Sequence, residues 1–227
     1  FGFVDGFDEE KVRSMELGIK SELMDRRLRI NADIFKSVYS DMQLNFLLAG
    51  TVADTKITNA GEAEMQGLEA DITFMATRNL LLMLNYAYLD AEVTKARDVN
   101  GQDVSDQFVF FAAPEQSYTA VADWTIVDAD WGRLGLNVSY NYMDERNGGS
   151  LASNVKNTRL EAYGVWNARL GLNEMPLAGG MLSVAAWGKN LLDEEYAISA
   201  IDNQPQADRS VLWGDPRSYG VDLIYRY

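Results

Sequence analysis

The sequence predicts an all-β protein, specifically a transmembrane antiparallel up-and-down β-barrel, on three observations. Apolar and polar residues alternate with a period of two along most segments, as they do in strands, whose successive side chains point to opposite faces. The alternating segments are about 11–17 residues long, whereas a tilted membrane-crossing strand needs about 9–11 residues and soluble strands average about 5–6. Short and long connections alternate along the chain, which is typical of a meander with two distinct ends.

The alternation places nine strands along the chain. It is clearest in RLGLNVSYNYM, where Leu136 and Val138 share one face and Asn137 and Ser139 share the other. The expected strands cover residues 12–23, 27–42, 59–75, 79–95, 115–126, 133–146, 159–173, 181–191 and 217–227. The short turns cover 23–26, 76–79, 127–132 and 174–180, and the long polar loops cover 43–58, 96–114, 147–158 and 192–216.

Alternation alone does not say which face is inside, because a soluble barrel has an apolar interior and a membrane barrel presents its apolar face to lipid. Two further features favour the membrane. Aromatic residues gather towards strand ends, as in the girdles of membrane barrels: Tyr86, Tyr88, Trp124, Tyr140, Tyr142, Trp166, Tyr225 and Tyr227. The other face carries polar groups that a dry interior would leave unpaired at a cost in free energy: Glu16, Lys20, Glu22, Asp33, Glu69, Asp71, Asn137 and Arg169.

The composition excludes several classes of function. The 227 residues include 34 acidic and 20 basic side chains, a net charge of -14, which opposes binding to nucleic acid phosphates. The chain has no cysteine and no histidine, so it offers no thiolate or histidine catalysis and no histidine-ligated zinc or haem. No apolar run approaches the roughly 20 residues of a membrane-spanning helix. No signal peptide opens the chain, so the protein either is not exported or lacks its true N-terminus.

Four stretches resemble the C-terminal part of the β-barrel of a TonB-dependent outer-membrane receptor. They are MELGIKSELMDRRLRINADIFKSVYSDMQ (15–43), NAGEAEMQGLEADI (59–72), WGKNLLDEEY (187–196) and GDPRSYGVDLIYRY (214–227). Within the second stretch the residues that match the family pattern are Asn59, Ala60, Gly61, Gln66, Gly67 and Glu69. The last two stretches, in this order, are the most specific.

The resemblance implies that the chain is a fragment of a larger receptor. Family barrels have 22 strands around a plugged lumen, and the nine strands would be the last nine. Residues 1–227 would then be the C-terminal part of the barrel, with the plug domain and the N-terminal strands absent. Because an open sheet leaves two unpaired edges that lipid does not tolerate, we expect that the fragment alone does not form a stable barrel.

The resemblance also implies active uptake of scarce ligands, most commonly ferric siderophores, across the cell outer membrane of a Gram-negative bacterium. The implied partners are outer-membrane lipid, the TonB energy-transducing complex acting through the missing N-terminal part, the barrel-assembly machinery, and a ferric siderophore or other small ligand. No enzymatic activity, cofactor or metal site is expected. A passive porin-like or adhesin barrel is the alternative, and an upstream plug domain would exclude it.

Candidate ligand contacts lie in or beside the long loops. Phe108 and Phe110 either face a ligand or simply begin a strand that enters the membrane. Tyr196, Arg209 and Trp213 combine aromatic rings with a cation, a mixture that suits an anionic aromatic chelate, although gatekeeping or loop packing explains them as well. The stretch DVNGQDVSD (98–106) offers carboxylates for calcium, but its spacing is not that of an EF-hand loop, so a solvated loop is the favoured interpretation.

Other residues receive structural interpretations. Glu69 and Asp71 are expected to pair with Arg or Lys of neighbouring strands, although contact with cargo or plug is the alternative. Asn190 is expected to bond to the backbone at a strand end, and Arg217 to fix the corner between a loop and the last strand. The family resemblance assigns Tyr227, the terminal aromatic, to the signal that the barrel-assembly machinery recognises.

Overall fold

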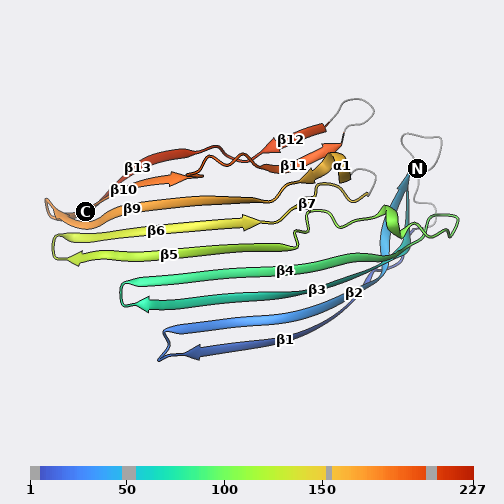
Figure 1. Ribbon diagram of the computed structural model, residues 1–227, viewed down its shortest axis with the longest axis horizontal. Helices are drawn as coiled ribbons and strands as arrows, with labels where there is room; N and C mark the ends of the chain where they lie inside the picture. Colours follow the sequence, from blue (N-terminus) through green and yellow to red (C-terminus); the bar gives the residue numbers. More distant parts are fainter. Residues whose placement is uncertain (1–5, 48–54, 152–154, 203–208) are drawn as a thin grey trace.

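The protein is an antiparallel sheet that follows the chain with almost no change of order (Figure 1). The computed structural model describes residues 6–47, 55–151, 155–202 and 209–227. The sheet has nine strands in the order β1-β2-β3-β4-β5-β6-β9-β10-β13. Their bounds are β1 Lys11–Leu23, β2 Leu28–Leu47, β3 Thr55–Thr77, β4 Leu80–Ala96, β5 Gln116–Ala129, β6 Gly132–Met143, β9 Tyr163–Leu177, β10 Gly180–Lys189 and β13 Ser218–Arg226. Figure 1 shows the short turns and the C-terminus at one end and the long connections at the other.

Short elements lie in the long connections, at the end that we call the loop end. They are the 3-10 turn η1 Ser105–Gln107, the four-residue helix α1 Val155–Thr158, and the strands β7 Arg146–Asn147, β8 Arg159–Leu160, β11 Ala197–Asp202 and β12 Arg209–Trp213. Strand β7 pairs with β8, and β11 pairs with β12. Residues 48–54, 152–154 and 203–208 of three predicted loops lie outside the described residues.

The nine predicted strands are confirmed, with differences at several of their ends. Strands β2 and β3 run further than predicted, because Gln43 to Leu47 pair with Asn59 to Thr55 in what was expected to be loop. Strand β9 begins at Tyr163 rather than at 159, since residues 159–160 pair with β7 instead. The same strand continues to Leu177, where a turn over 174–180 was predicted.

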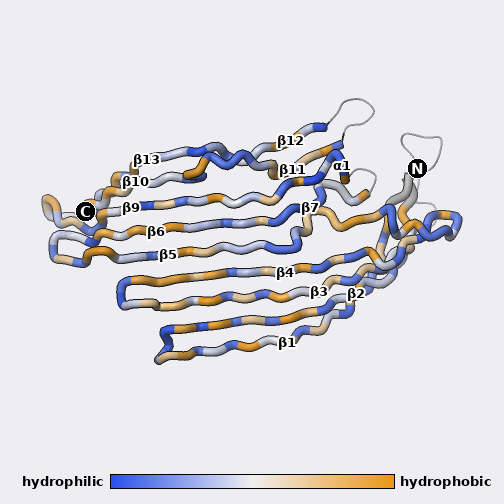
Figure 2. The backbone as a smooth tube through the Cα atoms, in the orientation of Figure 1, coloured by the Kyte–Doolittle hydropathy of each residue, from blue (hydrophilic) through white to orange (hydrophobic). Residues whose placement is uncertain are grey.

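Register separates the side chains into two faces. Directly opposite residues share a face, so Leu80, Trp124, Leu136, Leu170, Ala186 and Val221 form one uncharged row across six strands. We call this side the apolar face. The adjacent row on the other side, the polar face, contains Asp123, Asn137, Arg169 and Trp187. Figure 2 shows the resulting alternation of hydrophobic and hydrophilic residues along the strands.

The polar face is the concave one. A cavity of about 430 Å³ lies against it, and the side chains around it come from several strands. They include Asn31, Asp71, Asn85, Thr119 and Asn141, which occupy one row of the polar face from β2 to β6. A soluble barrel would put its apolar face inside. The cavity on this side indicates that the polar face lines the lumen, which answers the question that the alternation left open.

The apolar face has no protein partner among the described residues. Leu17, Val221 and Leu223 are each 72% exposed, and no large described side chain is fully buried. The face ends towards the loops at the row Ile34, Leu68 and Tyr88. The row of Lys36, Gln66 and Asp90 comes next on the same side, and Gln66 Nε2 donates to Asp90 Oδ2. The strands thus extend from an apolar band into water, which explains their length.

We expect neighbouring residues of β6 to tolerate a charge very differently. An arginine in place of Leu136 would be placed in the apolar band, and near the bilayer midplane it should cost about 2–4 kcal/mol of folding free energy. An arginine in place of Asn137 would face the lumen beside Asp123, to which Asn137 Nδ2 donates at 3.1 Å, and should be nearly neutral. The heat-modifiable gel shift of the full-length protein measures folding, and the reverse order of losses would invert the assignment of the two faces.

Candidate functional site

The two C-terminal motifs meet at the loop end and form one joint. Asn190, which directly follows β10 and has a left-handed φ of 49°, donates from Nδ2 to the carbonyl oxygens of Glu194 and Asp215 at 2.8 and 3.1 Å. Its Oδ1 accepts the Glu194 N–H at 2.8 Å. Asp193 accepts the Arg217 backbone N–H at 3.0 Å and lies 3.4 Å from its guanidinium. The predicted structural roles of Asn190 and Arg217 are confirmed, and each motif supplies the other's partners.

Tyr196 is held between two surfaces beside this joint. Its ring lies over Gly214, where an added Cβ would come within 2.1 Å of it, so only glycine allows this approach. The other contact is a stack on Tyr163 with ring centroids 4.3 Å apart. Burial raises the pKa of Tyr196, and the neighbouring Tyr163 adds to the shift. Tyr196 therefore stays neutral and acts as a packing and hydrogen-bonding group.

The structure brings Tyr196, Arg209 and Trp213 together, as the sequence suggested. All three line a cavity of about 260 Å³ between the end of β8 and the β11–β12 hairpin. Arg159, Glu161 and Glu195 line it too, and Arg159 forms an ion pair with Glu145 that raises the Arg159 pKa. Ligand pockets are usually about 300–1,000 Å³, so this cavity is smaller than a usual ligand pocket.

Phe108 and Phe110 lie between two larger cavities at the loop end. One, of about 540 Å³, lies between the outer part of β4 and residues 105–115. The other, of about 510 Å³, includes Leu44 and Val93 and is lined by uncharged residues. Both phenylalanines line both cavities. The alternative that this segment enters the membrane as a strand is wrong, because β5 begins only at Gln116.

Backbone pairing with the next connection holds the phenylalanine segment in place. Val109 N–H donates to the Ser150 oxygen at 2.9 Å, and Ala112 N–H to the Asn147 oxygen at 2.9 Å. Asn147 Nδ2 also donates to the oxygen of Phe110 at 3.3 Å. These hydrogen bonds therefore join the connection after β4 to the connection after β6 beside the two cavities.

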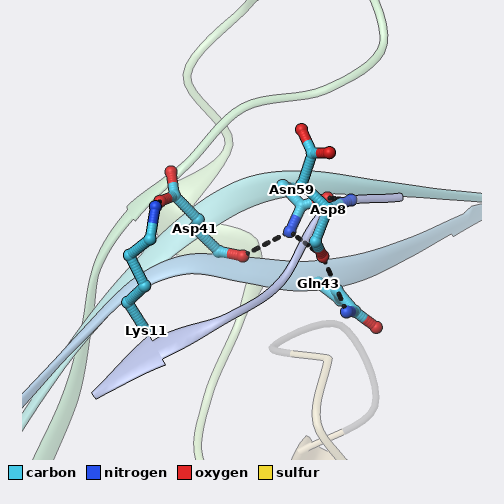
Figure 3. A network of polar contacts seen from close by, with 5 residues as sticks. All are labelled: Asp8, Lys11, Asp41, Gln43 and Asn59. Atoms are coloured by element: carbon cyan, nitrogen blue, oxygen red, sulfur yellow. Dashed lines mark hydrogen bonds and ion pairs between the residues drawn. The ribbon is translucent and has the colours of Figure 1, made fainter. Parts of the chain in front are cut away.

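Asn59, in the NAG motif, organises the outer end of β2 and β3. Its Nδ2 donates to the carbonyl oxygens of Asp8 and Asp41 at 2.9 and 2.8 Å, and its Oδ1 accepts the Asp8 N–H at 2.7 Å (Figure 3). Asp41 has a left-handed φ of 57° at a register shift in β2, and Lys11 lies 3.4 Å from its carboxylate. Gln43 Nε2 donates to the same Asp8 oxygen at 3.2 Å. The Asn59 side chain thus ties the bulge in β2 to the segment before β1.

Glu69 and Asp71 line the lumenal cavity together with Asp33. The expected pairing with neighbouring Arg or Lys is wrong, since within the described residues neither Glu69 nor Asp71 forms an ion pair. Their opposite neighbours are uncharged or acidic: Asn31 and Asn85 flank Asp71, and Asp33 and Ala87 flank Glu69. These carboxylates therefore remain available to the lumen.

The DVNGQDVSD loop satisfies its own carboxylates. Asp98 Oδ1 accepts the N–H groups of Asn100 and Gln102 at 2.9 and 2.8 Å, and Asp103 Oδ1 accepts the Ser105 N–H and hydroxyl at 3.0 and 2.6 Å. The Gln102 N–H holds the pKa of Asp98 below its usual value, and the Ser105 hydroxyl does the same for Asp103. Among the described residues, no group of three or more acidic side chains is placed to hold a metal ion.

Arg146 is a buried residue that the sequence did not single out. It is 7% exposed, and Nη2 donates to the carbonyl oxygens of Ala197 and Ile198 at 3.4 and 3.1 Å. Its guanidinium carbon lies 5.6 Å from the centre of the Tyr163 ring. The residue joins the connection after β6 to β11. The charge pattern of the sequence does not reveal the role of Arg146, because its partners are backbone oxygens and an aromatic ring.

Comparison with known proteins decides the family. A family model for the TonB dependent receptor-like β-barrel matches residues 1–191. The chain belongs to the TonB-dependent receptor family. Family members are outer-membrane β-barrel proteins of Gram-negative bacteria, and neither the relatives nor the structural neighbours are enzymes. Among the described residues, no helix is both long and apolar enough to cross a membrane.

Individual relatives match nearly all of this chain and a minor part of their own. The metal-pseudopaline receptor CntO of Pseudomonas aeruginosa is 27% identical over 97% of this chain and 28% of its own length. The ferric-pyoverdine M114 receptor PbuA of Pseudomonas sp. is 26% identical over 93% of this chain and 24% of its own. The crystal structure of the ferric yersiniabactin uptake receptor FyuA from Yersinia pestis has a TM-score of 0.71 at 20% identity, covering 96% of this chain and 30% of that one. The chain thus spans about a quarter to a third of each receptor named here.

Replacing Asn190 with alanine should open the joint between the two C-terminal motifs. Asn190 is only 2% exposed, and its loss removes the hydrogen bonds that it makes to the backbone of Glu194 and Asp215, each worth roughly 0.5–1.5 kcal/mol. Faster amide exchange at Glu194 and Arg217 in the full-length receptor would report the opening. Leu192→Ala, at a position 71% exposed in the same loop, is the matched control, and equal effects of the two changes would contradict the role of Asn190.

Proposed function

We propose that this chain is the C-terminal part of the barrel of an outer-membrane receptor that takes up a metal–chelate complex with energy delivered through TonB. The remaining barrel strands and a plug domain would come from residues outside it. The observation that carries the proposal is the pair of cavities of about 540 and 510 Å³ on either side of Phe108 and Phe110, at the loop end of a polar lumen. Both volumes fall within the usual range of ligand pockets.

The relatives support this class of cargo. The relatives named above are receptors for metal-pseudopaline and ferric pyoverdine, and structural neighbours include the ferric preacinetobactin receptor BauA of Acinetobacter baumannii. The more specific proposal is therefore that the cargo of the receptor is a ferric siderophore. The outer-membrane lipid would cover the apolar face, and the TonB complex would act through the part of the receptor outside this chain.

The proposal is tested by separating binding from energised transport. We expect the double variant Phe108→Ala, Phe110→Ala to bind a radio-iron-labelled chelate about tenfold more weakly, equivalent to about 1.4 kcal/mol. The reason is that both rings line both cavities. Trp131→Ala, at a 56% exposed residue in a turn at the opposite end, is the control. Loss of TonB should abolish uptake and leave binding intact. Uptake that continues without TonB would instead favour the passive porin-like alternative.

We further propose that Tyr227 belongs to the signal for barrel assembly. Tyr225 Oη donates to the carbonyl oxygens of Leu177 and Ala178 at 3.2 and 3.3 Å, so this aromatic clamps the β9–β10 turn. Tyr227 is 102% exposed, which leaves its ring accessible to another protein.

Tyr227→Ser should therefore lower the surface abundance of the full-length receptor with little change in the melting temperature of the assembled barrel. Tyr225→Phe, which removes only the hydroxyl that clamps the turn, should show the opposite pattern. Normal abundance of the Tyr227 variant, or equal losses in abundance and melting temperature, would leave Tyr227 as an ordinary interfacial residue.

A further inference from the structure

The polar face of β2, β3 and β4 changes character where these strands leave the apolar band. Its rows up to Asp33, Glu69 and Ala87 carry carboxylate and amide groups. Successive side chains alternate between the two faces, so the register gives the next rows on the same face, and none of these rows contains a charged residue. They are Phe35, Gly67 and Leu89, then Ser37, Met65 and Ala91, then Tyr39, Ala63 and Val93. The lumenal side of the three strands is therefore an uncharged, largely apolar wall at the loop end.

The other side of the same strands changes in the opposite sense. Beyond the row of Tyr88, Lys36 and Glu64 form an ion pair at 2.6 Å, and Asp90 and Glu92 follow along β4. Outside the apolar band these strands thus carry charges on the outer side and apolar residues on the lumenal side. Antiparallel sheets in water have this pattern when a second layer covers their apolar side. The apolar wall is therefore expected to have a cover.

The connection between β4 and β5 covers this wall only in part. Val104 N–H donates to the Ala96 oxygen at 2.8 Å, and both residues belong to a small buried cluster. Past this cluster the wall and residues 108–111 border the cavity of about 510 Å³, whose described lining contains no charged side chain. Phe111 and Leu151 belong to that lining and are 60% and 37% exposed. An apolar surface is therefore left without a protein partner among the described residues.

Backbone contacts fix both sides of this cavity. Phe108 pairs with Leu151 as an isolated antiparallel bridge, and Val109 N–H donates to the Ser150 oxygen at 2.9 Å. The wall on the other side is part of the continuous sheet. The cavity is therefore held in shape, as are ligand sites that form before the ligand binds.

The apolar cavity adjoins a more polar one. Val93, Phe108 and Phe110 line both it and the cavity of about 540 Å³. The second cavity adds polar side chains, among them Ser105 and Asn147. One molecule can therefore place a polar part in the second cavity and an uncharged part in the first.

We propose that the metal complex carried by this receptor bears a hydrocarbon arm, an acyl or alkyl chain, and that this arm enters the 510 Å³ cavity. The inference rests on the proposed function and names the substrate class of that site. The volume of the cavity lies in the usual range for ligands, and its uncharged lining offers a charged metal centre no partner. Water finds few hydrogen-bond partners in an apolar space, so a hydrocarbon chain is the occupant that the lining favours.

Entry of a hydrocarbon group into the cavity can be measured without knowing the cargo, because this chain has no cysteine of its own. Ser150→Cys places a thiol in the cavity lining, in a full-length receptor without other cysteines. We expect a polarity-sensitive naphthalene dye on this thiol to emit at a shorter wavelength than the same dye on Gln102→Cys. Gln102 is exposed and lines neither cavity. Equal emission, or a thiol at residue 150 that reacts only after unfolding because another part of the receptor fills the cavity, would overturn the proposal.

A series of cargo analogues then tests the arm. N-acylated ferrioxamine B complexes from acetyl to octanoyl share one metal centre and one charge, and differ only in the length of the chain. Binding to the full-length receptor should tighten about fourfold with each added methylene, equivalent to about 0.8 kcal/mol, until the cavity is filled. Binding of the acetyl complex without any dependence on chain length would overturn the arm and leave the proposed function untouched.

Matched variants assign the dependence to the cavity. Leu151→Asn with Phe111→Ser makes the exposed part of the lining polar, so it should flatten the dependence on chain length and shift the dye emission towards that at residue 102. Leu192→Asn with Ile201→Ser changes apolar residues that are 71% and 60% exposed at the same loop end but do not line the cavity, and should change neither readout. Equal effects of the two pairs would overturn the proposal. Absence of binding by every complex, with the dye emission as expected, would count against the proposed uptake of a metal chelate and not against the apolar site.

Discussion

The continuous backbone ladder from β1 to β13 is the constraint on which the rest of this structure depends. The sheet is one layer thick, and no large described side chain is fully buried in it. Cohesion therefore comes from hydrogen bonds between neighbouring strands, which in a bilayer have no water to compete with them. Because side chains alternate with a period of two, a slip of one residue would turn an entire strand's apolar set into the lumen. Register must consequently be fixed at the ends of the strands, where polar side chains can reach the backbone.

The family motifs supply that fixation. Asn59 ties the bulge at Asp41 to the segment before β1, and Asn190 ties β10 to the start of β13. On the polar face, Trp187 covers Gly220 and its Nε1 donates to Asp222 at 3.1 Å. Asp222 also forms an ion pair with Arg169, so β9, β10 and β13 are braced across three strands. A bulky ring over a glycine of the next strand protects the backbone and fixes alignment at the same time.

The strands could be predicted from the sequence because their signal is local. The period of two and the length of each segment are visible in residues such as 133–143, whatever the partner strand is. The pairing of Glu69 and Asp71 was predicted wrongly because it depends on register, which places Asn31 and Asn85 rather than bases beside Asp71. Arg146 was missed for a similar reason, since its partners are carbonyl oxygens of residues 51 and 52 positions away. The grouping of Tyr196, Arg209 and Trp213 was foreseen because one loop contains all three.

The distribution of the net charge of -14 links the fold to the site. Between the rows that contain Leu80 and Tyr88, the apolar face of β4 consists of leucine and tyrosine alone, because a charge there would meet lipid at a high cost. Acidic residues must then collect on the polar face, in the turns and around the loop end. The polar face is concave, so charges that would be screened on a convex surface are brought towards one another across a lumen. The alternation that gives the sheet its apolar face therefore also places Asp33, Glu69 and Asp71 together on the concave polar face.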